Sequence, residues 1–209
     1  MRHRWQPRLR GTVLLLAMLT VASAASAQNL LANGDFSSAS GLADWTWGPG
    51  GVVHGADSGS CALSGAADAS SGATPSNQFF AMYSTQCIEV DPVVTPTMHV
   101  AATYRTTAPV YARLHLQSFT DSACATFEGY YFGASGPTSA AWTAIGGTVT
   151  FGPNTRSFVV AADFNPIAAG TPAFTGSFDN IYVGVAPQVF VDGFEAESGS
   201  ACPWSNIVN

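Results

Sequence analysis

Four polar side chains occupy alternate positions of one ten-residue segment, Val110–Phe119, and their chemistry suits a ligand rich in hydroxyl groups. They are Tyr111, Arg113, His115 and Gln117. A pyranose ring presents apolar C–H faces, which stack on an aromatic ring, and hydroxyl groups, which need planar donors and acceptors such as amides and guanidinium. The segment therefore predicts a saccharide-binding face. The same alternation is typical of the solvent-exposed face of an ordinary antiparallel sheet, and the sequence leaves both interpretations open.

Aromatic residues elsewhere offer further stacking surfaces. Trp47 directly precedes Gly48-Pro49-Gly50-Gly51, a run that can present the indole ring on a loop. Trp45 is better explained as a core residue, because most large aromatic side chains pack inside. Tyr130 and Tyr131 are neighbours in the sequence, so in a strand one of them must face the core and only the other can contact a ligand.

The segments that position these side chains have the patterns of strands. Apolar residues alternate with the polar ones of Val110–Phe119, and helical periodicity is scarce because Gly and Pro recur. Two stretches, 48–77 and 164–176, are expected to be long loops, the first with short strand fragments. Further predicted strands are Met98–Arg105, Phe127–Phe132, Gly147–Phe151, Ser157–Phe164 and Phe178–Val185. Short strands at this spacing predict an all-β sandwich or barrel.

The N-terminus reads as a secretory signal peptide over residues 1–27, with a basic start, an apolar run at Val13–Val21 and a cleavage site before Gln28. We expect one domain over 28–186 and a tail over 187–209.

Four of the seven basic residues lie in the leader, which leaves three against thirteen carboxylates, a net charge of −10. Such a chain repels nucleic acid and anionic membranes. The oligomeric state is not readable.

Four cysteines follow the leader, and disulfides are the default in an exported chain. Four cysteines allow three pairings, and their spacing alone does not choose among them. We favour Cys87 with Cys124, because the first lies in a predicted strand and the second in a loop just past another. That choice pairs Cys61 with Cys202, which would tie the tail to the domain.

The two ends of the domain resemble a known family. The opening Asn29–Phe36 (Asn-Leu-Leu-Ala-Asn-Gly-Asp-Phe), the following Trp45 and the closing Phe178–Val183 (Phe-Asp-Asn-Ile-Tyr-Val) are similar to galactose-binding-like jelly rolls. Among these, the closest likeness is to the carbohydrate-binding modules of xylanases and cellulases. The resemblance implies a jelly-roll β-sandwich of two antiparallel sheets that binds a glycan. The alternative is a structural or adhesive extracellular protein of the same fold without a sugar ligand.

Many members of this family bind a structural Ca²⁺ where the first and last strands meet. The resemblance implies such a site at Asp35 and Asp179, since Ca²⁺ takes six to eight oxygen ligands. Two positions depart from the family pattern and reduce the charge available. Ser37 stands where relatives often have Glu, and Asn180 replaces a second Asp.

Residues for catalysis are not evident. The chain has no HExxH sequence and no Gly-x-Ser-x-Gly elbow. A glycosidase needs two carboxyl groups some 5–10 Å apart, roughly, and nothing in the sequence pairs Glu89, Glu128 or Asp163. We therefore expect a secreted, non-catalytic protein.

Overall fold

The computed structural model describes residues 28–37, 39–48, 51–61, 63–71, 80–107, 109–167 and 173–187. The predicted signal peptide and nearly all of the predicted tail lie outside these residues. No helix long and apolar enough to cross a membrane occurs in the described part of the chain.

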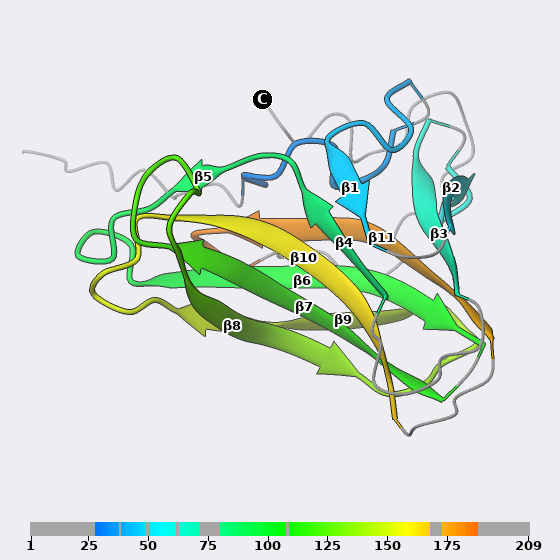
Figure 1. The fold of residues 1–209 in the computed structure, drawn as a ribbon. Helices are drawn as coiled ribbons and strands as arrows, with labels where there is room; N and C mark the ends of the chain where they lie inside the picture. Colours follow the sequence, from blue (N-terminus) through cyan, green and yellow to red (C-terminus); the bar gives the residue numbers. More distant parts are fainter. Residues whose placement is uncertain are drawn as a thin grey trace, which may run out of the picture.

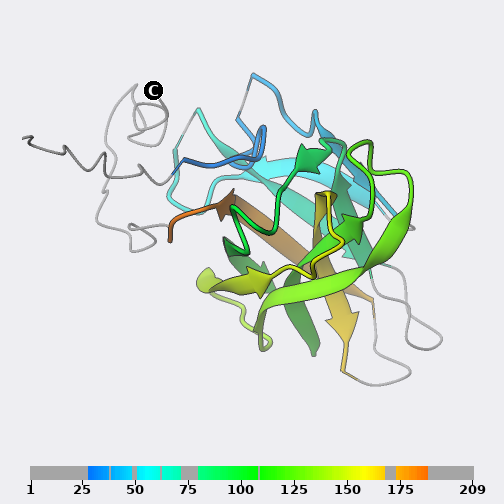
Figure 2. The same ribbon diagram turned by 90° about the vertical axis from the view of Figure 1, so that its left-hand side faces the viewer.

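The strands form two antiparallel sheets that pack face to face (Figures 1 and 2). Sheet A has the order β1-β4-β10-β7-β8, with β5 also paired to β10, and sheet B has the order β2-β3-β11-β6-β9. The strands of sheet A are β1 (Trp45–Trp47), β4 (Phe80–Ser84), β5 (Ile88–Glu89), β7 (Val110–Phe119), β8 (Phe127–Gly136) and β10 (Ser157–Pro166). Those of sheet B are β2 (Gly51–Ala56), β3 (Gly65–Ser71), β6 (Thr97–Thr106), β9 (Thr143–Thr150) and β11 (Phe174–Gly184). The predicted jelly-roll β-sandwich is confirmed.

The core lies between the sheets and is rich in aromatic rings. Phe164 of β10 stacks on Phe178 of β11 with a centroid distance of 4.5 Å, which joins the two sheets directly. The ring centroid of Tyr104 in β6 lies 6.4 Å from that of Phe178. Burial of large apolar side chains is the main favourable contribution to such a fold. The predicted core residue Trp45 is also buried there.

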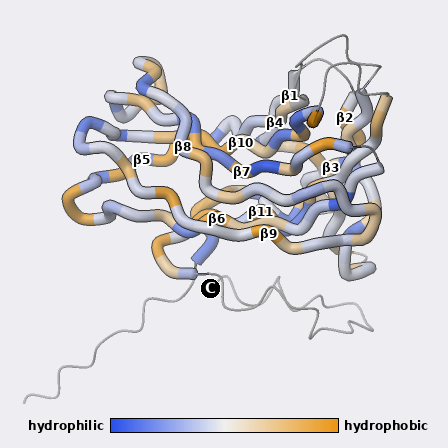
Figure 3. Tube along the Cα trace, turned by 90° about the horizontal axis from the view of Figure 1, so that it is seen from below, coloured by the Kyte–Doolittle hydropathy of each residue, from blue (hydrophilic) through white to orange (hydrophobic). Residues whose placement is uncertain are grey.

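The predicted alternation of β7 is confirmed. The core contains the four apolar residues Val110, Ala112, Leu114 and Leu116. The four polar residues that alternate with them point to the other side of sheet A. Figure 3 shows both hydrophilic and hydrophobic colours along β7. A side-chain period of two places every second residue on the same face.

Both predicted loops contain more strand than expected, so these two predictions are wrong in part. β3 lies inside the stretch 48–77, yet it is an inner strand of sheet B, between β2 and β11. Its inward residues are small, and Ala67 and Ala69 belong to the core cluster. The stretch 164–176 supplies the end of β10 and the start of β11. A Cβ at Gly176 would lie 2.6 Å from the Phe164 ring, so glycine here permits close packing of the sheets.

The opening turn anchors the first described residues to the last strand. Asn33 adopts φ 52°, and its side-chain amide donates to the carbonyl oxygens of Gly41 and Ala43. A Cβ at Gly34 would lie 2.2 Å from the carbonyl oxygen of Ile181, which explains a glycine in this turn. The Ile181 N–H donates to the Gly34 carbonyl over 2.8 Å. The expected meeting of the two ends of the domain is therefore present.

The predicted disulfide between Cys87 and Cys124 is confirmed, and it joins residues 37 positions apart. It ties the segment before β5 to the loop between β7 and β8. Cys61 is also disulfide-bonded. Cys202, its predicted partner, lies outside the described residues.

Candidate functional site

The outer face of sheet A brings together polar and aromatic side chains from four strands. Residues directly opposite each other in antiparallel strands point to the same side of a sheet. The polar residues of β7 therefore share their face with the residues opposite them on β10 and β8, and with Tyr83 of β4. We call this set the sheet A face: Tyr83, Tyr111, Arg113, His115, Gln117, Tyr130, Phe132 and Asp163.

An ion pair forms the centre of the sheet A face. Arg113 and Asp163 are directly opposite each other on β7 and β10. The Arg113 Nε donates to Asp163 Oδ1 over 2.8 Å, and Nη2 donates to Oδ2 over 3.1 Å. Asp163 is fully buried. Two parallel charge-assisted hydrogen bonds fix the plane of the guanidinium group.

The guanidinium group also lies over an aromatic ring. Its central carbon is 5.1 Å from the centroid of the Phe132 ring, within the range of a cation–π contact. Arg113 and Phe132 line a cleft of about 310 Å³, together with Gly133, Ala134 and Ser135. An apolar ring beside a planar donor is the combination that a sugar ring requires.

His115 is placed differently from the other predicted ligand residues. It is only 3% exposed, between Tyr130 and Phe132, whose ring centroids are 5.4 and 5.3 Å away. Its Nδ1 lies 3.1 Å from Asp163 Oδ2 but is not aligned for a hydrogen bond. His115 thus supports the two aromatic rings and the carboxylate from beneath and offers little surface to a ligand.

The exposed aromatic residues of this face come mainly from β8. Tyr130 is 51% exposed and Phe132 is 59% exposed. Tyr131 points inward, where its ring packs on Phe151 and its hydroxyl accepts a hydrogen bond from the Gly152 N–H. The prediction that only one of the two adjacent tyrosines faces outward is confirmed. Tyr111, near the start of β7, is also exposed.

Tyr83 extends the face on the side of β4. Burial raises the pKa of the Tyr83 hydroxyl, and the neighbouring Tyr130 and Asp163 raise it further. The hydroxyl group therefore stays protonated at neutral pH and can donate a hydrogen bond.

Trp47 does not lie on the sheet A face. It is opposite Met82, which is a core residue, so its side chain projects toward the side of sheet B. It is nevertheless half exposed, because β1 is the edge strand. The structure brings Tyr111, Arg113, His115 and Gln117 together and leaves Trp47 apart from them.

The surroundings of Asp35 and Asp179 do not fit a metal ion well. The Asp35 carbonyl oxygen accepts hydrogen bonds from Ser64 Oγ and the Gly65 N–H. The Asp179 carboxylate accepts from the N–H groups of Ser58 and Asn180 over 2.7 and 2.6 Å. Among the described residues, no group of three or more His, Cys, Asp or Glu side chains could hold a metal. Calcium binding stays a prediction.

Asp179 is nevertheless unusual, because its carboxyl group is buried. Desolvation raises its pKa to about 7, against the hydrogen bonds from Ser58 and Asn180, which lower it. The negative charge of Asp57 raises it further. A group with this pKa is about half protonated at neutral pH, so it carries less charge for a cation than an ordinary aspartate.

The sequence patterns did not predict that three members of the sheet A face would belong to it. Tyr83 lies in a strand that was not predicted, and Phe132 was placed in a strand without a role. Asp163 was considered only as a candidate acid. A lone aspartate among the apolar residues of β10 was a usable signal, because a buried carboxylate needs a partner. Its partner could not be named without the register of β10 against β7.

No protein-family model matches the chain, and no curated protein matches it. Solved structures do resemble it. The enzymatically active domain of tailspike protein 4 of bacteriophage CBA120 has a TM-score of 0.53 over 75% of this chain, at 12% identity. An arabinose-bound α-L-arabinofuranosidase has a TM-score of 0.50 over 76% of this chain, at 17% identity. A family 16 carbohydrate-binding module has a TM-score of 0.49 over 74% of this chain and 99% of its own, at 18% identity.

These similarities concern the fold. This chain spans 21% of the length of the tailspike structure and 26% of that of the arabinofuranosidase, so it is similar to one part of each. Several other similar structures are carbohydrate-binding modules, with 12–16% identity.

Proposed function

We propose that this chain is an exported, non-catalytic protein, similar in function to a carbohydrate-binding module, that binds a poly- or oligosaccharide on the sheet A face. The observation that carries this proposal is the placement of Arg113. Its guanidinium plane is fixed by Asp163, lies over the ring of Phe132 and lines a cleft. A sugar can stack on the exposed rings of Tyr130 and Phe132 while its hydroxyl groups bond to Arg113, Gln117 and Tyr83.

The charges of the face favour a neutral sugar. Arg113 is already neutralised by Asp163, and no other Arg or Lys is a member of the sheet A face. An anionic sugar would therefore gain little from this face, and the acidic chain as a whole repels it. A neutral oligosaccharide meets no such penalty.

Two observations support the parts of the proposal that concern export and the lack of catalysis. The one carboxylate of the sheet A face, Asp163, is buried and bonded to Arg113, so it is poorly placed to act as an acid or base. The Cys87–Cys124 disulfide is typical of an oxidising compartment outside the cytosol. Both agree with an exported binding protein.

A binding experiment on point variants tests the proposal. Calorimetric titrations with soluble neutral polysaccharides (xylan, mixed-linkage glucan, galactan and arabinan) first identify a ligand. Phe132→Ala and Tyr130→Ala are then each expected to weaken binding by about two- to tenfold, because a stacked ring contributes about 0.5–1.5 kcal/mol. Val93→Ala, at a highly exposed loop position, is the control and should leave the affinity unchanged.

Trp47→Ala separates the two surfaces that sequence analysis offered. A loss of affinity with Trp47→Ala and none with Phe132→Ala would move the site from the sheet A face to the edge of the sandwich. If the folded protein gives no heat of binding with any of the four polysaccharides, the result would contradict the proposal and support the structural or adhesive alternative.

A further inference from the structure

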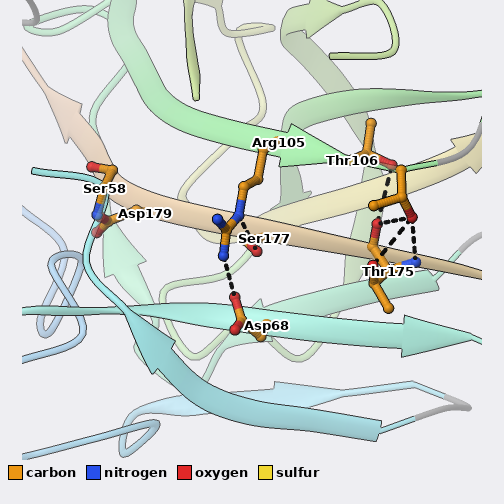
Figure 4. A network of polar contacts seen from close by, with 8 residues as sticks. Ser58, Asp68, Arg105, Thr106, Thr175, Ser177 and Asp179 are labelled. Carbon is orange, nitrogen blue, oxygen red and sulfur yellow. Dashed lines mark hydrogen bonds and ion pairs between the residues drawn. The ribbon is translucent and has the colours of Figure 1, made fainter. Parts of the chain in front are cut away.

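The outer face of sheet B, on the opposite side of the sandwich, holds a second polar cleft. Its volume is about 390 Å³, within the range of roughly 300–1,000 Å³ typical of small-molecule sites. Strands β3, β11 and β6, with the residue that directly follows β6, supply its polar side chains, which Figure 4 shows in part. These are Asp68, Ser70, Arg105, Thr106, Thr107, Thr175 and Ser177.

Arg105 is fixed in this cleft but makes few hydrogen bonds. Its Nε donates to Ser177 Oγ over 3.1 Å, and its guanidinium carbon lies 4.5 Å from the centroid of the Trp142 ring. The side chain is 40% exposed. The bond to Ser177 is the one hydrogen bond that its guanidinium makes within the described part of the chain, so most of its five N–H groups stay available to a ligand.

Asp68 lies beside Arg105 without completing its hydrogen bonds. The distance from Asp68 Oδ1 to Arg105 Nη2 is 3.8 Å, which is an ion pair but too long for a hydrogen bond (Figure 4). Oδ1 is buried and has no hydrogen-bond partner among the described residues. The Asp68 side chain as a whole is 33% exposed, so a ligand can reach it.

Hydroxyl groups close the other end of the cleft. Thr107 Oγ1 lies 3.1 Å from Thr175 Oγ1 and accepts a hydrogen bond from the Thr175 N–H over 3.1 Å. Both residues are exposed. The cleft therefore offers a carboxylate, a planar guanidinium and hydroxyl groups in one row, with both donors and acceptors.

We propose that this cleft is a second saccharide-binding site, which holds a neutral sugar through two neighbouring hydroxyl groups. One hydroxyl group donates to the Asp68 carboxylate, and the next accepts from the Arg105 guanidinium. An anionic ligand is disfavoured, because Asp68 stands beside the arginine and the chain is acidic. This inference does not depend on sugar binding by the sheet A face, since it rests on other residues.

Residue-resolved NMR titration of the oxidised protein tests each face separately. The probes are hexasaccharides of β-1,4-linked xylose, glucose and galactose, with oligogalacturonate as the anionic comparison. The amides of Thr107, Thr175 and Ser177 and the Arg105 Nε–H are expected to shift with at least one neutral probe. These shifts should persist in Phe132→Ala, which weakens only the sheet A face. The amides of Gln117 and Tyr130 report on that face.

Two conservative variants identify the contacts. Arg105→Lys keeps the charge but loses the planar fork, and Asp68→Asn keeps the shape but loses the negative charge. Each is expected to weaken the titration of the sheet B signals at least tenfold, without changing that of the sheet A signals. Arg156→Ala is the matched control, because within the described part of the chain this arginine bonds only to backbone carbonyl oxygens near its own position.

Several results would overturn the inference. These are an absence of sheet B shifts with every probe, sheet B shifts that are unchanged in both conservative variants, or a response to oligogalacturonate alone. Shifts confined to Gln117 and Tyr130 would leave the proposed function standing and remove the second site. Shifts confined to the sheet B signals would do the opposite.

Discussion

The two outer faces of the sandwich each carry an arginine–aspartate pair, and the two pairs differ in register. Arg113 and Asp163 are directly opposite each other on adjacent strands, with contacts of 2.8 and 3.1 Å. Arg105 and Asp68 are both opposite Ser177, so β11 separates them and their closest atoms are 3.8 Å apart. Adjacent strands are about 4.8 Å apart. Two side chains separated by two strand spacings therefore meet only when both are extended.

This difference assigns different roles to chemically identical pairs. The Arg113 pair is closed, because its carboxylate is buried and receives two hydrogen bonds. It holds a guanidinium plane rigid for its neighbours. The Arg105 pair is open, because both side chains are about one-third exposed or more and their groups do not bond to each other. An open pair retains donors and acceptors for a ligand.

The largest expected effect is on folding stability. Asp163→Ala leaves Arg113 unpaired beside buried His115, and breaking a buried ion pair costs about 3–5 kcal/mol. Asp68→Ala removes a long, exposed pair, which contributes about 0–1 kcal/mol. Urea denaturation of both variants measures the two free energies of unfolding. Equal losses would contradict the distinction between a closed and an open pair.

The second largest expected effect is a pH dependence of folding stability. It comes from sheet B, because the buried Asp179 lies in β11 of that sheet. Its pKa is raised from 3.8 to about 7 in the folded protein, so the folded state binds more protons than the unfolded state between these values. Its contribution to stability is fully present below pH 3.8 and is lost as the pH rises through 7. The slope is at most about 1.4 kcal/mol per pH unit.

Denaturation of the wild type and of Asp179→Asn from pH 4 to pH 8 measures this contribution. We expect the wild type to lose stability relative to the variant as the pH rises, because the variant has no titratable side chain at position 179. A difference that stays constant with pH would contradict a raised pKa. Melting at pH 8 with Ca²⁺ or EDTA tests the calcium prediction in the same samples, since a bound ion raises Tm.

The smallest expected effect concerns the ring under the open pair. Trp142→Ala removes the cation–π contact that holds Arg105, which is worth about 0.5–1 kcal/mol at an exposed site. We expect a similarly small loss of stability together with a broadened Arg105 Nε–H signal in NMR spectra. An unchanged Arg105 signal would show that Ser177 alone fixes the guanidinium. Phe132→Ala, under Arg113, should leave the Arg113 Nε–H sharp, because Asp163 still holds it.

The sequence by itself determined the features that depend on a local pattern. Strict alternation placed Tyr111, Arg113, His115 and Gln117 on one side of β7, because side chains alternate whatever the neighbouring strands are. That only one of Tyr130 and Tyr131 can face outward followed from the same local rule. The Cys87–Cys124 pairing was chosen correctly from a predicted strand and loop.

Only the tertiary structure decided which residues meet across strands. Register made Asp163 the partner of Arg113, buried His115 beneath Tyr130 and Phe132, and turned Trp47 to the other side of sheet A. It also made an inner strand of the alanine-rich β3, because small side chains fit where the sheets approach closely. A strand's own sequence specifies its two faces, whereas pairing and packing with other strands specify what each face contacts.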